Sequence, residues 1–167
     1  MSDNAPQIIM GIDPGLSATG WAVLAGGGDQ ARLIAYGAIR TRTHDPLSVR
    51  LHAICEEVRR LVTEYVPSEV AVEDVFMAKD ARAAFALGQA RGAAIVGASL
   101  AGCKVEGYTA LQVKKSVTGN GQAAKDQVGY MVQRLLQLSE AIRPDHAADA
   151  AAVALCHLSK RSLKVLS

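Results

Sequence analysis

Three polar side chains lie close together in the segment PDHAADA, residues 144–150: Asp145, His146 and Asp149. Alanine is the strongest helix former, and residues three or four apart share one face of a helix. We therefore expect a helix from 145 to about 160, whose small alanines leave an open, shallow surface dominated by these polar groups. Carboxylates and imidazoles are side chains that bind divalent cations.

Two further acidic residues stand at the ends of apolar segments. Asp13 ends QIIMGID, residues 7–13, and Glu73 comes near the end of EVAVED, residues 69–74. An aspartate before a Pro-Gly turn is by itself more often a turn former. An acid that directly follows a buried strand, however, lies at the sheet edge where α/β proteins bind ligands.

Carboxylates that converge in a protected site repel one another unless a cation separates them, so Asp13, Glu73 and Asp149 predict a divalent metal. Oxygen ligands favour Mg²⁺ or Mn²⁺, and an imidazole from His146 shifts the preference toward Mn²⁺. Two ions about 4 Å apart can activate water and stabilise the leaving oxygen of a phosphodiester. The residues thus indicate nuclease chemistry. Asp145 shares the helix face, but it can instead interact with the helix dipole.

Hydrophobic periodicity predicts the elements that position these acids. We expect strands at 7–13, 19–25, 31–41, 69–74 and 103–108, and helices at 46–65, 80–100, 109–117, 124–138 and 145–160. Strands joined by hairpins followed by strands alternating with helices predict a mixed α/β sheet with helices on both faces.

The composition limits the class of protein. With 167 residues, 50% of them hydrophobic, the chain is long enough for one domain and too short for two. A net charge of +2 neither demands nor excludes a nucleic-acid partner. The apolar segment GAAIVGASLAG, residues 92–102, is too short to cross a bilayer. The first residues do not read as an export signal, so we expect a cytoplasmic protein without a membrane partner.

Four segments together resemble the RuvC family of Holliday junction resolvases: MGIDPGLSATGWAVL, VEDVFMAKDARAAFALGQARGAAIV, QVKKSVTGNGQAAKDQV and DHAADAAAVALCH. They span residues 10 to 157 in the expected order. The resemblance implies one RNase H-like domain over 1–167, ordered from about 7 to 160, with a five-stranded mixed sheet. It also implies a homodimeric, metal-dependent endonuclease of recombination and repair that resolves four-way DNA junctions by paired symmetric nicks.

The resemblance carries over to individual residues. It implies that Asp13, Glu73 and Asp149 are catalytic metal ligands and that His146 is the fourth. Many relatives have aspartate where this chain has His146, so Asp145 remains the competing ligand. The family also makes the branch-migration proteins RuvA and RuvB plausible partners.

Basic and aromatic residues form the predicted DNA-binding set. Lysines usually lie solvated on surfaces, but the resemblance assigns Lys114 and Lys125 to the DNA backbone, where each neutralises a phosphate. An exposed Phe76 could wedge against an unstacked base at the branch point. Weaker candidates for the same basic track are Lys79, Arg82 and Lys115.

Glycines in the helix at 80–100 bear on oligomeric state. Gly88 and Gly92 leave one side of it nearly bare, although each interior glycine costs about 1 kcal/mol relative to alanine. That side can pack either on the sheet or on the same helix of a twofold partner. A C₂ dimer would present two cutting sites to one junction.

Other functions remain open from the sequence. GIDPGLSATG also resembles the phosphate loop of sugar-kinase and actin-like ATPases, although those need two such domains. A related nuclease acting on RNA, or a junction-binding protein with a decayed site, would carry much of the same pattern.

Overall fold

The computed structural model describes residues 6–27, 30–74 and 80–165. Phe76 and Lys79, both predicted to bind DNA, lie outside these ranges. The helices and strands, in chain order, are β1 (Gln7–Asp13), β2 (Ala18–Gly27), β3 (Gln30–Arg40), α1 (Leu47–Tyr65), β4 (Glu69–Glu73), α2 (Ala81–Leu100), β5 (Lys104–Tyr108), α3 (Ala110–Thr118), α4 (Lys125–Leu135) and α5 (Asp145–Val165).

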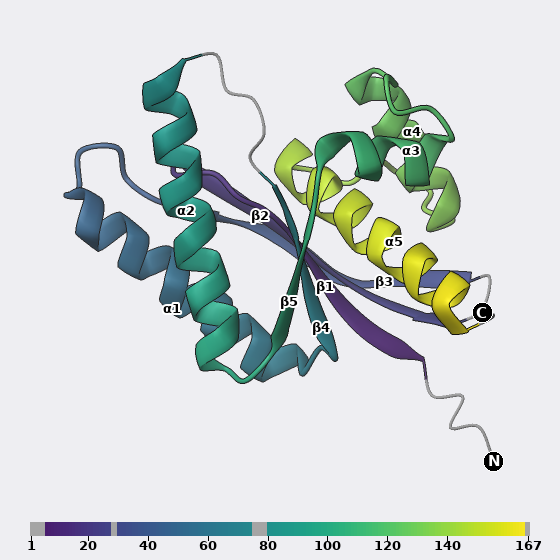
Figure 1. Cartoon of the computed structure of the whole chain (residues 1–167), viewed down its shortest axis with the longest axis horizontal. Coiled ribbons are helices and arrows are strands. Elements are labelled where there is room, and N and C mark those ends of the chain that lie inside the picture. Colours follow the sequence, from purple (N-terminus) through teal and green to yellow (C-terminus); the bar gives the residue numbers. More distant parts are fainter. Residues whose placement is uncertain (1–5, 28–29, 75–79, 166–167) are drawn as a thin grey trace.

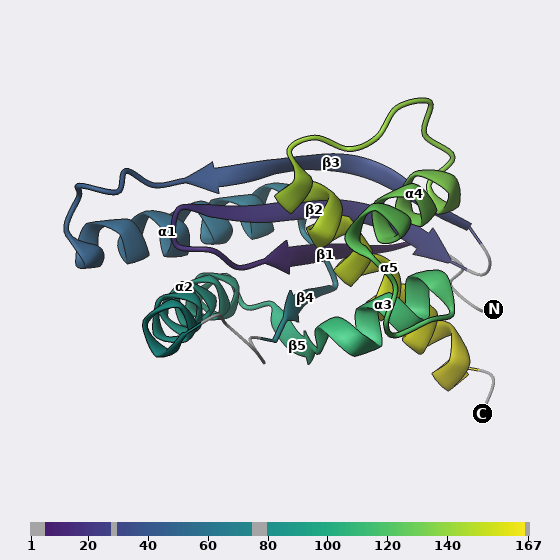
Figure 2. The same cartoon turned by 90° about the horizontal axis from the view of Figure 1, so that it is seen from above.

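The five strands form one mixed sheet in the order β3-β2-β1-β4-β5. β1, β2 and β3 pair antiparallel, whereas β4 runs parallel to β1 and β5 parallel to β4. Helices α1 and α2 cover one face, and α3, α4 and α5 lie on the other (Figures 1 and 2). The predicted mixed α/β sheet with helices on both faces is confirmed.

Alternation along β1 divides the core between the two faces. Ile9 is buried with the α5 cluster, and its neighbour Met10 is buried with Ile54 and Val58 of α1. Successive side chains of a strand point to opposite faces, so a strand flanked by helices on both sides is apolar throughout. This accounts for the unbroken apolar run before Asp13.

Helix α5 lies unusually close to the sheet. A Cβ atom on Gly11 would stand 2.0 Å from the Ala150 carbonyl oxygen, and one on Gly20 would stand 1.9 Å from the His146 carbonyl oxygen. Ala150 and Ala154 are fully buried. The expectation of an open, shallow alanine surface was therefore wrong: the small residues allow the helix backbone to approach the bare strand backbone, as close packing requires.

Two helix ends differ from the sequence-based prediction. α4 stops at Leu135 rather than 138, because Gln137 adopts a left-handed conformation with φ of 53° that a helix cannot continue. α5 continues past 160 to Val165. Lysine and arginine are good helix formers, and Arg161 in this last part pairs with Glu69 at the start of β4.

By length and composition alone, α2 is the one described helix that could cross a membrane. Core helices of soluble proteins meet the same criterion, and α2 packs against α1. A Cβ on Gly97 would stand 2.3 Å from the Cys55 carbonyl oxygen, and Ala90 and Ala94 are fully buried. The apolar character of α2 is thus partly explained by its packing on α1.

Candidate active site

Asp13 and Glu73 end two adjacent parallel strands. Ile12 of β1 is paired with Val72 of β4, so the acids that follow them emerge side by side at the same edge of the sheet. Just beyond Asp13 the chain turns, and the buried Thr19 hydroxyl donates a hydrogen bond to the Gly15 carbonyl oxygen at 2.8 Å. This hydrogen bond fixes the turn that follows Asp13, and with it the end of the strand that carries the acid.

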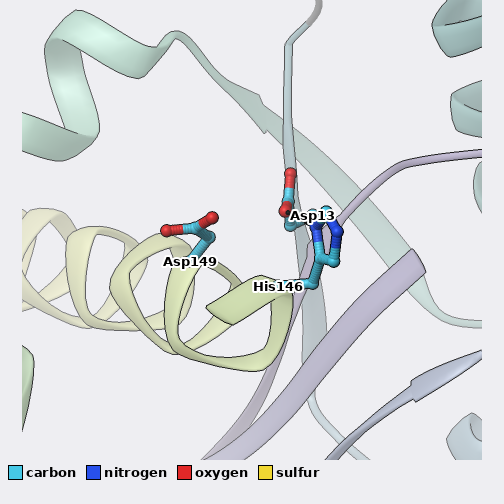
Figure 3. A group of neighbouring side chains, drawn as sticks. All are labelled: Asp13, His146 and Asp149. Carbon is cyan, nitrogen blue, oxygen red and sulfur yellow. Dashed lines mark hydrogen bonds and ion pairs between the residues drawn. The ribbon is translucent and has the colours of Figure 1, made fainter. Parts of the chain in front are cut away.

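Helix α5 brings two further polar groups to this edge. Gly20 of β2 lies directly opposite Asp13, and the first turn of α5 rests on Gly20. One ligand atom each from Asp13, His146 and Asp149 lies within 4.8 Å of the others (Figure 3). The Nδ1 atom of His146 is 3.1 Å from Oδ2 of Asp13. Residues more than 130 positions apart, 13 and 146, thus share one site.

The electrostatics of the site reflect burial and crowded negative charge. Burial, followed by the charge of Asp149, raises the pKa of Asp13 to about 7. Burial, followed by the charges of Asp13 and Asp149, raises the pKa of Glu73 to about 8. A side-chain hydrogen bond with Asp13 contributes to the raised pKa of Glu73, so the two carboxyls lie near each other. Crowded carboxyls either hold protons or bind a cation.

The donor set fits a hard divalent cation. Ligands on one Mg²⁺ or Mn²⁺ ion stand about 3 to 4 Å apart, and the three ligand atoms already lie within 4.8 Å. Glu73 adds a carboxyl near enough for the charges of Asp13 and Asp149 to raise its pKa. An imidazole beside three carboxyls suits Mn²⁺ as well as Mg²⁺.

The two competitors for the fourth ligand position occupy different environments. Asp145 is exposed and pairs with the guanidinium of Arg143. His146 faces Asp13 instead, with its side chain 47% exposed. The structure therefore brings His146 rather than Asp145 to the acid cluster, and its role as a ligand stays a prediction.

The predicted lysines differ in their distance from the acids. Lys125, the first residue of α4, places its ammonium 3.0 Å from Oδ2 of Asp149. Lys114 on α3 is close enough for its charge to oppose the raised pKa of Glu73. Lys115 and Arg82 are exposed on α3 and α2.

Arg91 is a residue that the sequence reasoning missed. Its guanidinium pairs with Asp74, and its Nε donates to the Glu73 carbonyl oxygen at 3.3 Å. Asp74 follows Glu73 directly, yet this ion pair turns it to α2 and away from the acid cluster. An arginine among the alanines and glycines of α2 was the only sequence signal, and it did not indicate its partner.

Comparison with known proteins adds the decisive observation. The family model described as "Crossover junction endodeoxyribonuclease RuvC" matches residues 9–157. The chain belongs to the RuvC family. A RuvC from Magnetococcus marinus is 44% identical over 161 residues, which cover 96% of this chain and 89% of that relative.

Solved RuvC structures show the same fold. The Thermus thermophilus RuvC structure matches with a TM-score of 0.87 at 37% identity, covering 95% of this chain and 97% of that one. The structure of T. thermophilus RuvC in complex with Holliday junction substrate matches with a TM-score of 0.89 at 37% identity, covering 95% and 96%. The predicted RuvC membership and RNase H-like fold are confirmed, and so is the predicted class of enzyme, a nuclease.

Proposed function

We propose that this chain resolves four-way DNA junctions by paired symmetric nicks in a divalent-metal-dependent hydrolysis that serves recombination and repair. One observation carries the proposal: Asp13, His146 and Asp149 converge within 4.8 Å in a RuvC-family chain, with Glu73 against Asp13. The T. thermophilus relative that matches with a TM-score of 0.89 is in complex with Holliday junction substrate.

Asp13, Glu73, His146 and Asp149 are the proposed ligands of Mg²⁺ or Mn²⁺, with two ions in each site. When bound, the ions supply an activated water and stabilise the leaving oxygen of the phosphodiester. The contribution of the protein itself is to hold the proposed ligands in position. Asp13 and Glu73 are held by paired strands, Arg91 anchors the end of β4, and Asp13 orients the imidazole of His146.

Basic residues around the acids bind the DNA backbone. Lys114 and Lys125 flank the acid cluster, where each can neutralise a phosphate and release counterions. Lys115 and Arg82 extend the positive surface, and Lys79 belongs to the same proposed set. Phe76 is the proposed wedge at the branch point. Phosphate contacts position a protein on DNA without reading its sequence.

The exposed side of α2 supports a homodimer. A Cβ on Gly88 or Gly92 would meet no atom within 4 Å, so the bare side faces away from the sheet. Phe85 and Val96 continue that side at helical spacing and are 69% and 50% exposed. Two such helices related by a twofold axis would cover these groups and place two sites on one junction.

Membership of the RuvC family supports three further proposals. Residues 1–167 act as a single RNase H-like nuclease domain with an ordered core from about 7 to 160. The protein works in the cytoplasm, and RuvA and RuvB are its proposed partners in branch migration.

A cleavage assay tests the proposal. The purified protein is incubated with a labelled four-way junction, a linear duplex or an RNA hairpin, in Mg²⁺, Mn²⁺ or EDTA. Symmetric nicks in the junction alone, lost in EDTA, are expected. Junction binding without nicks in either metal would overturn the proposal in favour of a decayed site. Cleavage of the hairpin, or ATP turnover without nicks, would overturn it in favour of the other two alternatives.

A further inference from the structure

The contact between Lys125 and Asp149 joins a DNA-binding candidate directly to a candidate ligand. The ammonium lies 3.0 Å from Oδ2 of Asp149, a hydrogen-bonded ion-pair distance. Lys125 is the first residue of α4, and Asp149 lies in the first turns of α5, so the two residues come from different helices. A lysine ammonium is therefore paired with a carboxylate oxygen of a candidate metal ligand.

This position makes the ammonium and a metal ion competitors. Three carboxylates and one imidazole face a single volume, and the ammonium compensates part of their charge. A divalent cation that coordinates Oδ2 competes with the ammonium for that oxygen, because two cations on one carboxylate oxygen repel each other. This competition weakens metal binding in the absence of DNA.

The side chain of Lys125 is exposed enough to leave Asp149. Its side chain is 64% exposed, whereas that of Asp149 is only 26% exposed. The aspartate is thus held by its helix, and the flexible four-carbon stem of the lysine can swing toward solvent. A phosphate of bound DNA, which carries one negative charge, is an alternative partner for the same ammonium.

We propose that Lys125 is an exchangeable counter-cation that holds Asp149 until DNA phosphate takes its ammonium, so that junction binding raises the affinity of the site for metal. The inference rests on the proposed function, because it needs both a metal site and a DNA ligand. Linkage makes the effect reciprocal: bound metal raises junction affinity by the same factor. The device limits metal loading, and hence cutting, until a substrate is present.

Lys125 is not needed to dock α4. Val128 and Val132 of α4 are 7% and 1% exposed and belong to the same buried cluster as the α5 alanines. Substitution of the exposed lysine should therefore leave the fold intact. Lys114 offers a matched control, because its charge also acts on the acid cluster through Glu73, while the ion pair to Asp149 is made by Lys125.

The first measurement is the Mn²⁺ affinity of full-length protein without DNA, followed by the electron paramagnetic resonance signal of free Mn²⁺. Lys125→Met should bind Mn²⁺ about fivefold more tightly than wild type, the size expected for loss of one partly exposed ion pair. Lys125→Arg should stay near wild type, and Lys114→Met should change the affinity less than Lys125→Met. Equal tightening in the two methionine variants would overturn the inference, because it would reveal a general effect of charge.

The second measurement is junction affinity in EDTA and in Ca²⁺, with the DNA verified as uncut on a denaturing gel. Ca²⁺ should strengthen junction binding by wild type more than by Lys125→Met, with a difference of about fivefold. An identical gain in both proteins would overturn the inference and leave the proposed function standing. If wild type bound no Mn²⁺ with or without junction DNA, the proposed metal site would fail as well.

Discussion

Helix α5 carries two histidines, each paired with a carboxylate from a strand, and the two pairs differ in environment. Near its start, His146 Nδ1 lies 3.1 Å from Asp13 Oδ2. Three turns further on, His157 Nε2 lies 2.8 Å from Glu69 Oε2. The side chain of His146 is 47% exposed and that of His157 only 2%. The same two residue types therefore form an open acidic site at one place and a buried contact at the other.

The buried contact is balanced in charge. The Tyr108 hydroxyl lies 2.8 Å from His157 Nδ1 and can donate a hydrogen bond to it, which leaves the Nε2 proton facing Glu69. That Nε2 makes no well-aligned hydrogen bond, but the short distance to the carboxylate keeps it electrostatically paired. Arg161 places its Nη1 atom 2.8 Å from the other oxygen of Glu69. Burial lowers the pKa of His157, so the ring is neutral beside an ion pair.

The acid cluster lacks this balance. Asp13 and Glu73 repel each other and Asp149, and both have raised pKa values, which is the pattern of a functional site. The comparison shows that residue types alone do not distinguish a binding site from a structural contact. The sign and compensation of the surrounding charge do.

The largest expected effect is the loss of nicking activity when an acid of the cluster is replaced, an effect not expected for the buried His157 pair. Asp149→Asn or Asp13→Asn should lower the junction-nicking rate by at least about a thousandfold, because each removes a proposed metal ligand, an interaction worth several kcal/mol in the transition state. Junction affinity in EDTA should change little, since phosphate contacts supply most of it. Parallel loss of binding and cutting would show that the acids act on DNA binding instead.

Substitutions in the buried pair of His157 and Glu69 should lower the stability of the protein and leave its nicking rate nearly unchanged. His157→Ala removes a fully packed ring and leaves Glu69 and Tyr108 without their partner, so the free energy of unfolding in urea should fall by about 3 kcal/mol. Tyr108→Phe, which removes one hydrogen bond, should cost about 1 kcal/mol. The nicking rate per folded molecule should remain within a few-fold of wild type. A stable but inactive His157→Ala protein would contradict the conclusion that this pair is structural.

The two regions should also give opposite pH dependences of stability without metal. The folded-state pKa of His157 is lowered, so the unfolded chain binds more protons and stability falls as pH drops below about 6.5. The pKa values of Asp13 and Glu73 are raised to about 7 and 8. Their folded forms bind more protons, so these groups add stability as pH falls from about 8 toward 4.

Glu73→Gln isolates the second of these effects. At pH 8 it should raise the free energy of unfolding of the metal-free protein by about 1 kcal/mol, because it removes one repelling charge. The gain should vanish near pH 5, where Glu73 is protonated in the folded wild type. Thermal unfolding at the two pH values measures it, with Glu57→Gln on the solvated side of α1 as control. A loss of stability at pH 8 would indicate that Glu73 is a structural residue.

The smallest expected effect concerns the kind of ligand. His146→Asp should keep nicking activity and shift the ratio of rates in Mn²⁺ and Mg²⁺ a few-fold toward Mg²⁺, because an oxygen would replace the proposed nitrogen ligand. Asp145→Asn is the matched control, since Asp145 pairs with Arg143. If the rate ratio changed in Asp145→Asn and not in His146→Asp, Asp145 rather than His146 would be the fourth ligand.

Much of this arrangement follows from local patterns. The unbroken apolar runs of β1 and β4 identified strands buried on both faces, and the acids at their ends were recognisable for that reason. The order of strands and helices was likewise predictable from periodicity, because each element has to bury one apolar face.

Long-range contacts explain what the sequence left open. Glu73 and Asp74 are adjacent acids whose side chains point in opposite directions along the strand, and Arg91 on α2 pairs with Asp74. Lys125 meets Asp149 from another helix. The alanines of α5 suggested an open surface because Gly11 and Gly20, which they contact, lie on strands far away in the chain.

All four proposed ligands stand on regular elements: Asp13 and Glu73 on paired strands, His146 and Asp149 on a helix seated on bare strand backbone. Such a cutting centre has little freedom to reach out for a phosphate. The nucleic acid has to deform instead, and a rigid linear duplex pays more elastic energy for that than a branched one with unstacked arms. Preference for branched DNA can then arise from the mechanics of the substrate, without any base being read.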